Sequence, residues 1–136
     1  MIIYIDENMA PQLAEGLNLL QIPENVKLKE EVEVRSIKKE FGMGAQDEDW
    51  LPKIGEEGSC VITRDLNIQR TRHQRELYMK YGVGIFFLAA GKKGLSYWES
   101  VKLLIKTWEQ IVKYSTRKQR PFAFRLKSNG KLEELT

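Results

Sequence analysis

Cys60-Val61-Ile62-Thr63-Arg64-Asp65 gives the clearest sign of the architecture, because an unbroken run of strand-forming residues ends in a charged pair. A longer run, Val83–Leu88, and a shorter one, Ile2–Ile5, are apolar in the same way. Strands without polar alternation are typical of a parallel sheet whose two faces are both covered. The sequence therefore predicts a buried parallel sheet at the centre of the molecule.

The segments between these runs have the periodicity of amphipathic helices. Pro11 opens the first helix, Asp47 stands near the start of the next, and Thr71 is expected to cap one that ends at Tyr81. Ser96 and Glu99 form a capping box at the head of a long last helix. Leu13, Leu17 and Leu20 recur at helical spacing in the first helix. The last helix has one apolar stripe that is expected to pack into the core and comprises Tyr97, Val101, Leu104, Ile105, Trp108, Ile111 and Val112.

Two weaker patterns complete the order of elements. Val32 and Val34 alternate with charged residues, which predicts an edge strand or a strand with one polar face, and Ile37–Phe41 predicts a helical turn. Strands then alternate with helices along the chain. This order predicts an α/β fold of three layers, with helices on both faces of a mainly parallel sheet.

The end of the chain has a different pattern. Phe122–Leu126 and Lys131–Leu135 flank Asn129-Gly130, which is a strong signal for a β-hairpin. We expect one domain over residues 1–136, with a core of about 1–114 and a hairpin extension of about 121–135.

Composition excludes several classes of protein. The chain has 42% hydrophobic and 30% charged residues, which is typical of a soluble globular protein, and no apolar run is long enough to span a bilayer. The single cysteine, Cys60, rules out an internal disulfide framework and a cysteine-rich zinc site, and we expect it to fill core volume. The first residues lack the features of a signal peptide, so a cytoplasmic location is expected.

Acidic residues follow the predicted strands where a parallel sheet collects its ligands. Asp6 follows the first strand and Asp65 the third, while Asp47 precedes the helix that leads into the third strand. Converging carboxylates repel one another unless a cation lies between them. Oxygen ligands without histidine or cysteine indicate Mg²⁺ or Mn²⁺, so the pattern predicts metal-dependent attack on a phosphodiester.

Each of these residues also has a structural explanation. Asp6 and Asp47 could each cap the helix that follows, and Asp65 could occupy a turn. The functional interpretation depends on the three acting together.

Three segments resemble the acidic motifs of PIN-like ribonucleases, most closely the branch found as toxins in toxin–antitoxin pairs: Ile5–Asn8, Asp47–Trp50 and Val61–Asp65. The likeness extends over about residues 1–88. It implies that Asp6, Asp47 and Asp65 are the catalytic, metal-binding carboxylates of an endoribonuclease. It also implies an RNA substrate and a cognate antitoxin protein as partner, and it leaves a homodimer open.

The chain departs from the PIN pattern at one position. Asn67 stands near the place where such domains often carry a fourth acidic residue, so one or two metal ions could be held. Glu7 and Asp49 are secondary candidates, because they adjoin or lie close to expected ligands.

Basic residues are concentrated after the third acidic motif. Arg64, Arg70, Arg72 and Arg75 are candidates for binding phosphates, and a solvated helix face is the alternative. His73, the only histidine, is expected to be polar surface, although a general base is an alternative role. Acidic residues gather over 40–57 and basic ones over 113–131, which could steer a polyanion or form solvated faces.

Other functions fit less of the sequence. A phospho-acceptor receiver domain also has acidic residues after strands one and three, but it would give Asp47 no role. A PIN-like module that binds nucleic acid without cutting it, and a nuclease acting on DNA, both stay open. The tryptophans are expected on apolar helix faces, and the hairpin could extend the sheet, bind RNA or receive a partner protein.

Overall fold

The computed structural model describes the chain except residues 7, 65–67, 90–93 and 136, together with the side chains of residues 68–71. Its elements in chain order are β1 (Ile2–Ile5), α1 (Pro11–Asn25), β2 (Glu33–Ser36), α2 (Ile37–Phe41), α3 (Asp47–Glu57), β3 (Cys60–Arg64), α4 (Ile68–Lys80), β4 (Gly84–Leu88), α5 (Tyr97–Arg117), β5 (Phe122–Leu126) and β6 (Leu132–Glu134).

The strands form a six-stranded sheet in the order β2-β1-β3-β4-β5-β6. Every neighbouring pair is parallel except β5 and β6, which are antiparallel. The register places Ile5 of β1 beside Ile62 of β3. The carboxyl ends of β1 and β3 therefore meet at one edge of the sheet, where ligands of open α/β sheets bind.

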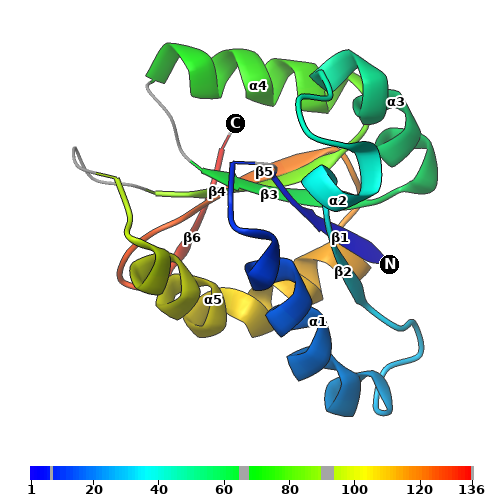
Figure 1. Cartoon of the computed structure of the whole chain (residues 1–136), viewed down its shortest axis with the longest axis vertical. Helices are drawn as coiled ribbons and strands as arrows, with labels where there is room; N and C mark the ends of the chain where they lie inside the picture. Colours follow the sequence, from blue (N-terminus) through cyan, green and yellow to red (C-terminus); the bar gives the residue numbers. More distant parts are fainter. Residues whose placement is uncertain (7, 65–67, 90–93, 136) are drawn as a thin grey trace.

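Helices cover both faces of the sheet (Figure 1). On one face, α1 and α5 pack against a core cluster that includes Leu17, Phe86 and Leu104. On the other face, α2, α3 and α4 contribute Ile37, Trp50 and Tyr78 to a second cluster. These two cores confirm the predicted three-layer α/β architecture and its mainly parallel sheet.

The local sequence accounts for the ends of α3. Gln46 is the N-cap, and its backbone N–H donates to Oδ2 of Asp49 at 3.0 Å, which closes a capping box. Gly58 ends the helix in the left-handed region, with φ of 74°, a conformation that favours glycine. Because Gln46 is the cap, Asp47 is left as the first residue inside the helix.

The expected elements differ from the observed ones at two places. The helix expected to start at Thr71 begins at Ile68, because the intervening Gln69 and Arg70 are good helix formers. The strand expected around Val32 and Val34 covers Glu33–Ser36, because the backbone N–H of Val32 donates to the Asn25 side chain instead.

The C-terminal hairpin is confirmed, and it extends the main sheet. β5 pairs with β4 in parallel and β6 then pairs with β5, so the hairpin forms one edge. Among the helices in the described part of the chain, none combines the length and the apolar character that a membrane span requires.

Candidate active site

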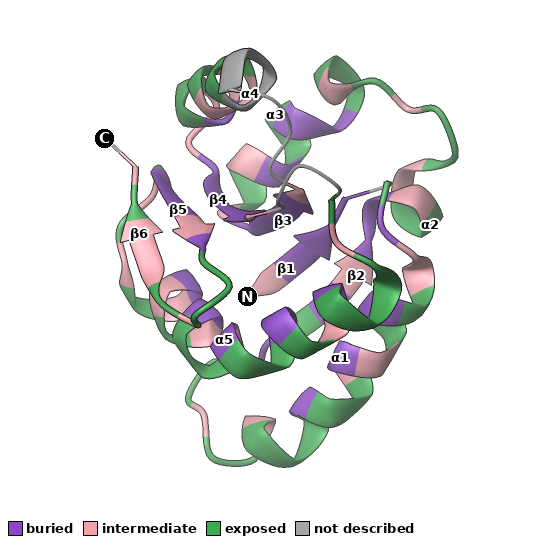
Figure 2. Ribbon diagram, turned by 90° about the vertical axis from the view of Figure 1, so that its left-hand side faces the viewer, coloured by how far each residue is buried: buried purple, intermediate pink, exposed green. Residues whose placement is uncertain are grey.

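Asp6 directly follows β1, a strand that is buried along most of its length (Figure 2), and Asp6 is itself buried. Its backbone N–H donates to the carbonyl oxygen of Ile62 at 3.0 Å, which holds it against β3. Its side chain is held too, because the hydroxyl of Thr63 donates to Oδ2 of Asp6 at 2.7 Å. Burial and this short hydrogen bond fix the carboxylate at the edge of the sheet.

Asp47 is the first residue of α3. It is half-buried, and the capping box next to it is made by Gln46 and Asp49. The cap that Asp47 could have formed is therefore supplied by its neighbours. A carboxylate in the first turn of a helix is stabilised by the helix dipole.

Tyr78 of α4 lies within electrostatic reach of both carboxylates. Its side chain is fully buried, and its ring makes an edge contact with Trp50 of α3 at 6.0 Å between centroids. The pKa of the Tyr78 hydroxyl is raised, first by burial and then by the negative charges of Asp6 and Asp47. The two carboxylates therefore act on the same buried hydroxyl, and it stays protonated.

The third predicted ligand, Asp65, lies outside the described residues, as do Glu7 and Asn67. The strand that precedes Asp65 ends at Arg64, beside the strand that precedes Asp6. No three acidic, histidine or cysteine side chains that could hold a metal meet within the described residues. Of the three predicted ligands, Asp6 and Asp47 are described, and the charges of both act on the hydroxyl of Tyr78.

The chemistry of these donors fits a hard divalent cation. Asp6 and Asp47 offer carboxylate oxygens, and the described surroundings add hydroxyls of Thr63 and Tyr78. The one cysteine, Cys60, is buried in the core as expected, and burial raises the pKa of its thiol. Oxygen donors of this kind suit Mg²⁺ or Mn²⁺ better than zinc.

The predicted phosphate-binding residues occupy different environments. Arg64 is half-buried, and its Nε has no hydrogen-bond partner among the described residues. On α4, Arg72 is exposed and Arg75 is half-buried, while the side chain of Arg70 lies outside the description. His73 is exposed, as expected of a surface residue.

The exposure of individual side chains tests the remaining predictions about Asp49, the tryptophans and the apolar helix faces. Asp49 is exposed and serves the capping box of α3. Trp50 is buried and Trp108 is partly buried, whereas Trp98, which lies beside apolar residues of α1 and α5, is 68% exposed. Ile105 and Tyr97 of the predicted core stripe are also exposed, as is Leu20 of α1. The reason is that no described element covers the groove between α1 and α5.

Sequence reasoning missed Thr63 and Tyr78. Thr63 was assigned only to the buried strand, although it lies two residues before Asp65 and the parallel register sets it beside the end of β1. That register was the signal that could have found it. Tyr78 gave no such signal, because its position depends on how α4 crosses the sheet.

Comparison with known proteins gives one match. A family model described as PIN like domain matches residues 1–90, which include β1 to β4 and all three predicted acidic segments. No curated protein and no solved structure is significantly similar to the chain.

Proposed function

The chain belongs to the PIN-like domain family, whose members are often nucleases, and we propose on this basis that it is a metal-dependent endoribonuclease. The observation that supports the proposal is the placement of Asp6 directly after β1 and of Asp47 at the start of α3, with the charges of both acting on the buried hydroxyl of Tyr78. Buried carboxylates are costly to collect in one place unless they bind a cation.

Asp6, Asp47 and Asp65 would hold the metal in this proposal. When bound, Mg²⁺ or Mn²⁺ stabilises charge on phosphate oxygens and lowers the pKa of a bound water. Thr63 fixes the rotamer of Asp6 through its hydrogen bond. Tyr78 is buried, and burial together with the charges of Asp6 and Asp47 raises the pKa of its hydroxyl, which therefore stays protonated.

Arginines are proposed to position the substrate. Arg72 and Arg75 lie three residues apart on α4, which places them on one helical face, and Arg70 would act independently. Arg64 follows Thr63 directly and has a buried, unpartnered Nε among the described residues. A guanidinium group in this position can bind a phosphate through two hydrogen bonds.

We further propose that the chain is the toxin of a toxin–antitoxin pair and that an antitoxin protein encoded next to it inhibits its activity. This part rests on the likeness of the three acidic segments to that branch of the family. Induced expression in a bacterial host should arrest growth, and co-expression of the neighbouring antitoxin should restore it. Growth arrest by the Asp6→Asn variant, with its carboxylate removed, would contradict a catalytic toxin.

Metal dependence is the test of the proposed reaction. Purified protein should cleave single-stranded RNA with Mn²⁺ or Mg²⁺, and chelator should abolish cleavage while the circular dichroism spectrum stays unchanged. Asp6→Asn and Asp47→Asn should each lower turnover by about 10²-fold or more, as loss of a charge-stabilising group does. Glu48→Gln is the matched control, because Glu48 is an exposed carboxylate adjacent to Asp47.

Two results would contradict the proposed metal-dependent mechanism. Cleavage that continues in chelator, with metal verified absent, would exclude the metal mechanism. Activity of both Asn variants at the level of Glu48→Gln would show that the two carboxylates are not catalytic. A parallel DNA substrate separates ribonuclease from general nuclease activity, since only RNA carries the 2′-hydroxyl.

A further inference from the structure

Positive charge is concentrated in the part of the chain that lies outside the family match. Residues 1–90 contain eleven basic and fifteen acidic residues, whereas residues 91–136 contain eleven basic and four acidic ones. The matched part holds the proposed metal site, and α5, β5 and β6 form most of the remainder. A polyanion that reaches the protein therefore finds most of its counter-charge on α5 and the C-terminal hairpin.

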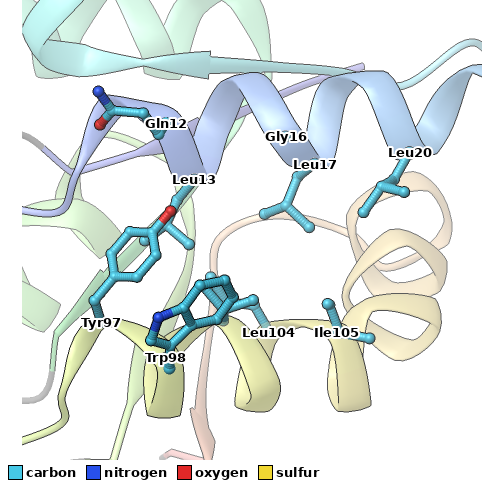
Figure 3. Close-up of a pocket in the computed structure, with 10 residues that line it drawn as sticks. Gln12, Leu13, Gly16, Leu17, Leu20, Tyr97, Trp98, Leu104 and Ile105 are labelled. Atoms are coloured by element: carbon cyan, nitrogen blue, oxygen red, sulfur yellow. The ribbon is translucent and has the colours of Figure 1, made fainter.

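The turn of this hairpin packs against α5. Nε2 of Gln110 donates to the carbonyl oxygen of Gly130 at 3.2 Å. The aliphatic part of Lys106 lies so close to Gly130 that an added Cβ would overlap it, and Gly130 has a φ of 84°, which favours glycine. The side of α5 that faces α1 carries Leu104 and Ile105 instead (Figure 3), so the hairpin meets another side of the helix.

Three exposed lysines surround this contact. Lys102 lies one turn before Lys106 on α5, so the two are neighbours on the helix surface, and Lys131 directly follows Gly130 in the turn. We call Lys102, Lys106 and Lys131 the lysine patch. Among the described residues, none of the three forms an ion pair. The ion pairs of this region use other basic residues, namely Lys118, Arg125 and Lys127.

The acidic side chains close to the patch do not neutralise it. On α5, Glu99 accepts from the backbone N–H of Ser96 at 2.9 Å in the capping box, and Glu109 is the other acidic residue. On the hairpin, Glu133 is shared by two cations at 3.3 Å each, and Glu134 pairs with a third at 3.1 Å. Among the described residues, this leaves the carboxylate of Glu109 against three lysines.

The turn lies along the same sheet edge as the proposed metal site. Leu88 of β4 pairs in register with Arg64 of β3 and with Leu126 of β5, so the carboxyl ends of these strands form one row. The turn begins directly after Leu126. Neighbouring strands are about 4.8 Å apart, so the ends of β3 and β5 are about 10 Å apart across β4. A single strand of nucleic acid bound at the site can therefore continue along this edge to the lysine patch.

We propose that the lysine patch binds phosphates of a single-stranded RNA whose scissile bond lies at the proposed metal site. The proposal rests on the proposed nuclease function and adds a binding site for the part of the substrate beyond that bond. Lysines contact phosphates as point charges, so the patch contributes affinity on nearly every sequence. The hairpin then serves as a substrate-binding extension of the PIN-like domain.

The first experiment measures RNA affinity by fluorescence anisotropy in chelator, so that no cleavage occurs. In the double variant Lys106→Gln, Lys131→Gln, affinity should fall about fivefold per lost contact at about 0.1 M salt, and the log–log salt slope should flatten by about 0.7 per contact. Glutamine keeps part of the aliphatic chain over Gly130, and thermal melting checks the fold. The matched control is Lys27→Gln, Lys29→Gln, because these exposed lysines lie between α1 and β2, at the opposite edge of the sheet.

The second experiment locates the patch relative to the scissile bond. Cleavage with metal is measured on RNA of roughly 4 and 16 nucleotides, which span the usual range of single-strand site sizes. The double variant at Lys106 and Lys131 should raise KM for the long RNA with little change in kcat, because the patch positions backbone and does not act on the reacting atoms. Both constants should stay unchanged for the short RNA, which does not extend to the patch.

Four outcomes would overturn the lysine patch. Unchanged affinity and salt slope in the double variant, with RNA still bound and cleaved, would leave the proposed nuclease intact and remove the patch. Equal losses in the double variant and its control would reduce the effect to general charge. Loss of binding to an acidic partner protein, with RNA affinity unchanged, would assign the patch to a protein. A wild-type chain that neither binds nor cleaves RNA would overturn the proposed function and the patch together.

Discussion

At the scale of single residues, the hydrogen bond from Thr63 to Asp6 is the contact that holds the candidate site together. It joins residues 57 positions apart and is buried. A hydrogen bond to a charged group contributes about 1.5–3 kcal/mol, and its loss leaves the carboxylate with fewer donors in a buried position. Thr63 therefore links the stability of the fold to the geometry of the site.

Thr63→Val removes the hydroxyl while preserving the shape of the side chain. We expect the free energy of unfolding to fall by about 1.5–3 kcal/mol and RNA cleavage to fall with it, because Asp6 is no longer held. Thr63→Ser restores the donor and should recover most of the activity. Chemical denaturation and cleavage rates of the three proteins provide the test, and equal activity in Thr63→Val and Thr63→Ser would contradict the positioning role.

At the scale of elements, α3 carries Asp47 at its first residue and is packed tightly near its end. Gly55 lies so close to the backbone of Tyr81 that an added Cβ would overlap the Tyr81 carbonyl oxygen. Glycine is required here by the close approach of two backbones. The position of Asp47 thus depends on packing at the far end of its helix.

Gly55→Ala sets two effects against each other. Alanine favours the helix by roughly 0.5–1 kcal/mol, but overpacking against a backbone costs about 1–3 kcal/mol, so net destabilisation is expected. Gly16→Ala in α1 is the control, since no neighbour lies within 4 Å of its added Cβ and only the helix term acts. Thermal melting of dilute protein should lower the midpoint for Gly55→Ala and raise it for Gly16→Ala. A stabilised Gly55→Ala protein would show that α3 can shift without cost.

At the scale of the whole molecule, some charged residues of the acidic stretch 40–57 and of the basic stretch 113–131 are neutralised by ion pairs. Glu40 pairs with Arg35 at 3.2 Å, and Lys118 pairs with Glu134 at 3.1 Å. These two stretches therefore contribute less to the electrostatic potential around the molecule than their sequence suggests. Steering of a polyanion then depends more on arginines close to the site.

The double variant Arg72→Ala, Arg75→Ala tests this substrate-binding role. If each arginine contacts one phosphate, the log–log dependence of RNA affinity on salt should flatten by about 0.7 per contact. Turnover at saturating RNA should change less than affinity, because backbone contacts position the substrate. Lys80→Ala, at the opposite end of α4, is the control for general charge loss. An unchanged salt slope in the double variant would exclude these contacts.

The sequence by itself determined the order of strands and helices, the parallel sheet and the acidic residues at its edge. These are encoded locally, by uninterrupted apolar runs, caps and glycines. Only the tertiary structure decided that Thr63 binds Asp6 and that the charges of Asp6 and Asp47 both act on the hydroxyl of Tyr78. It also decided that Ile105 faces solvent, although its periodicity placed it in the core. The physical reason is that a helical pattern shows which face is apolar, whereas the spacing of neighbouring helices determines how much of that face is covered.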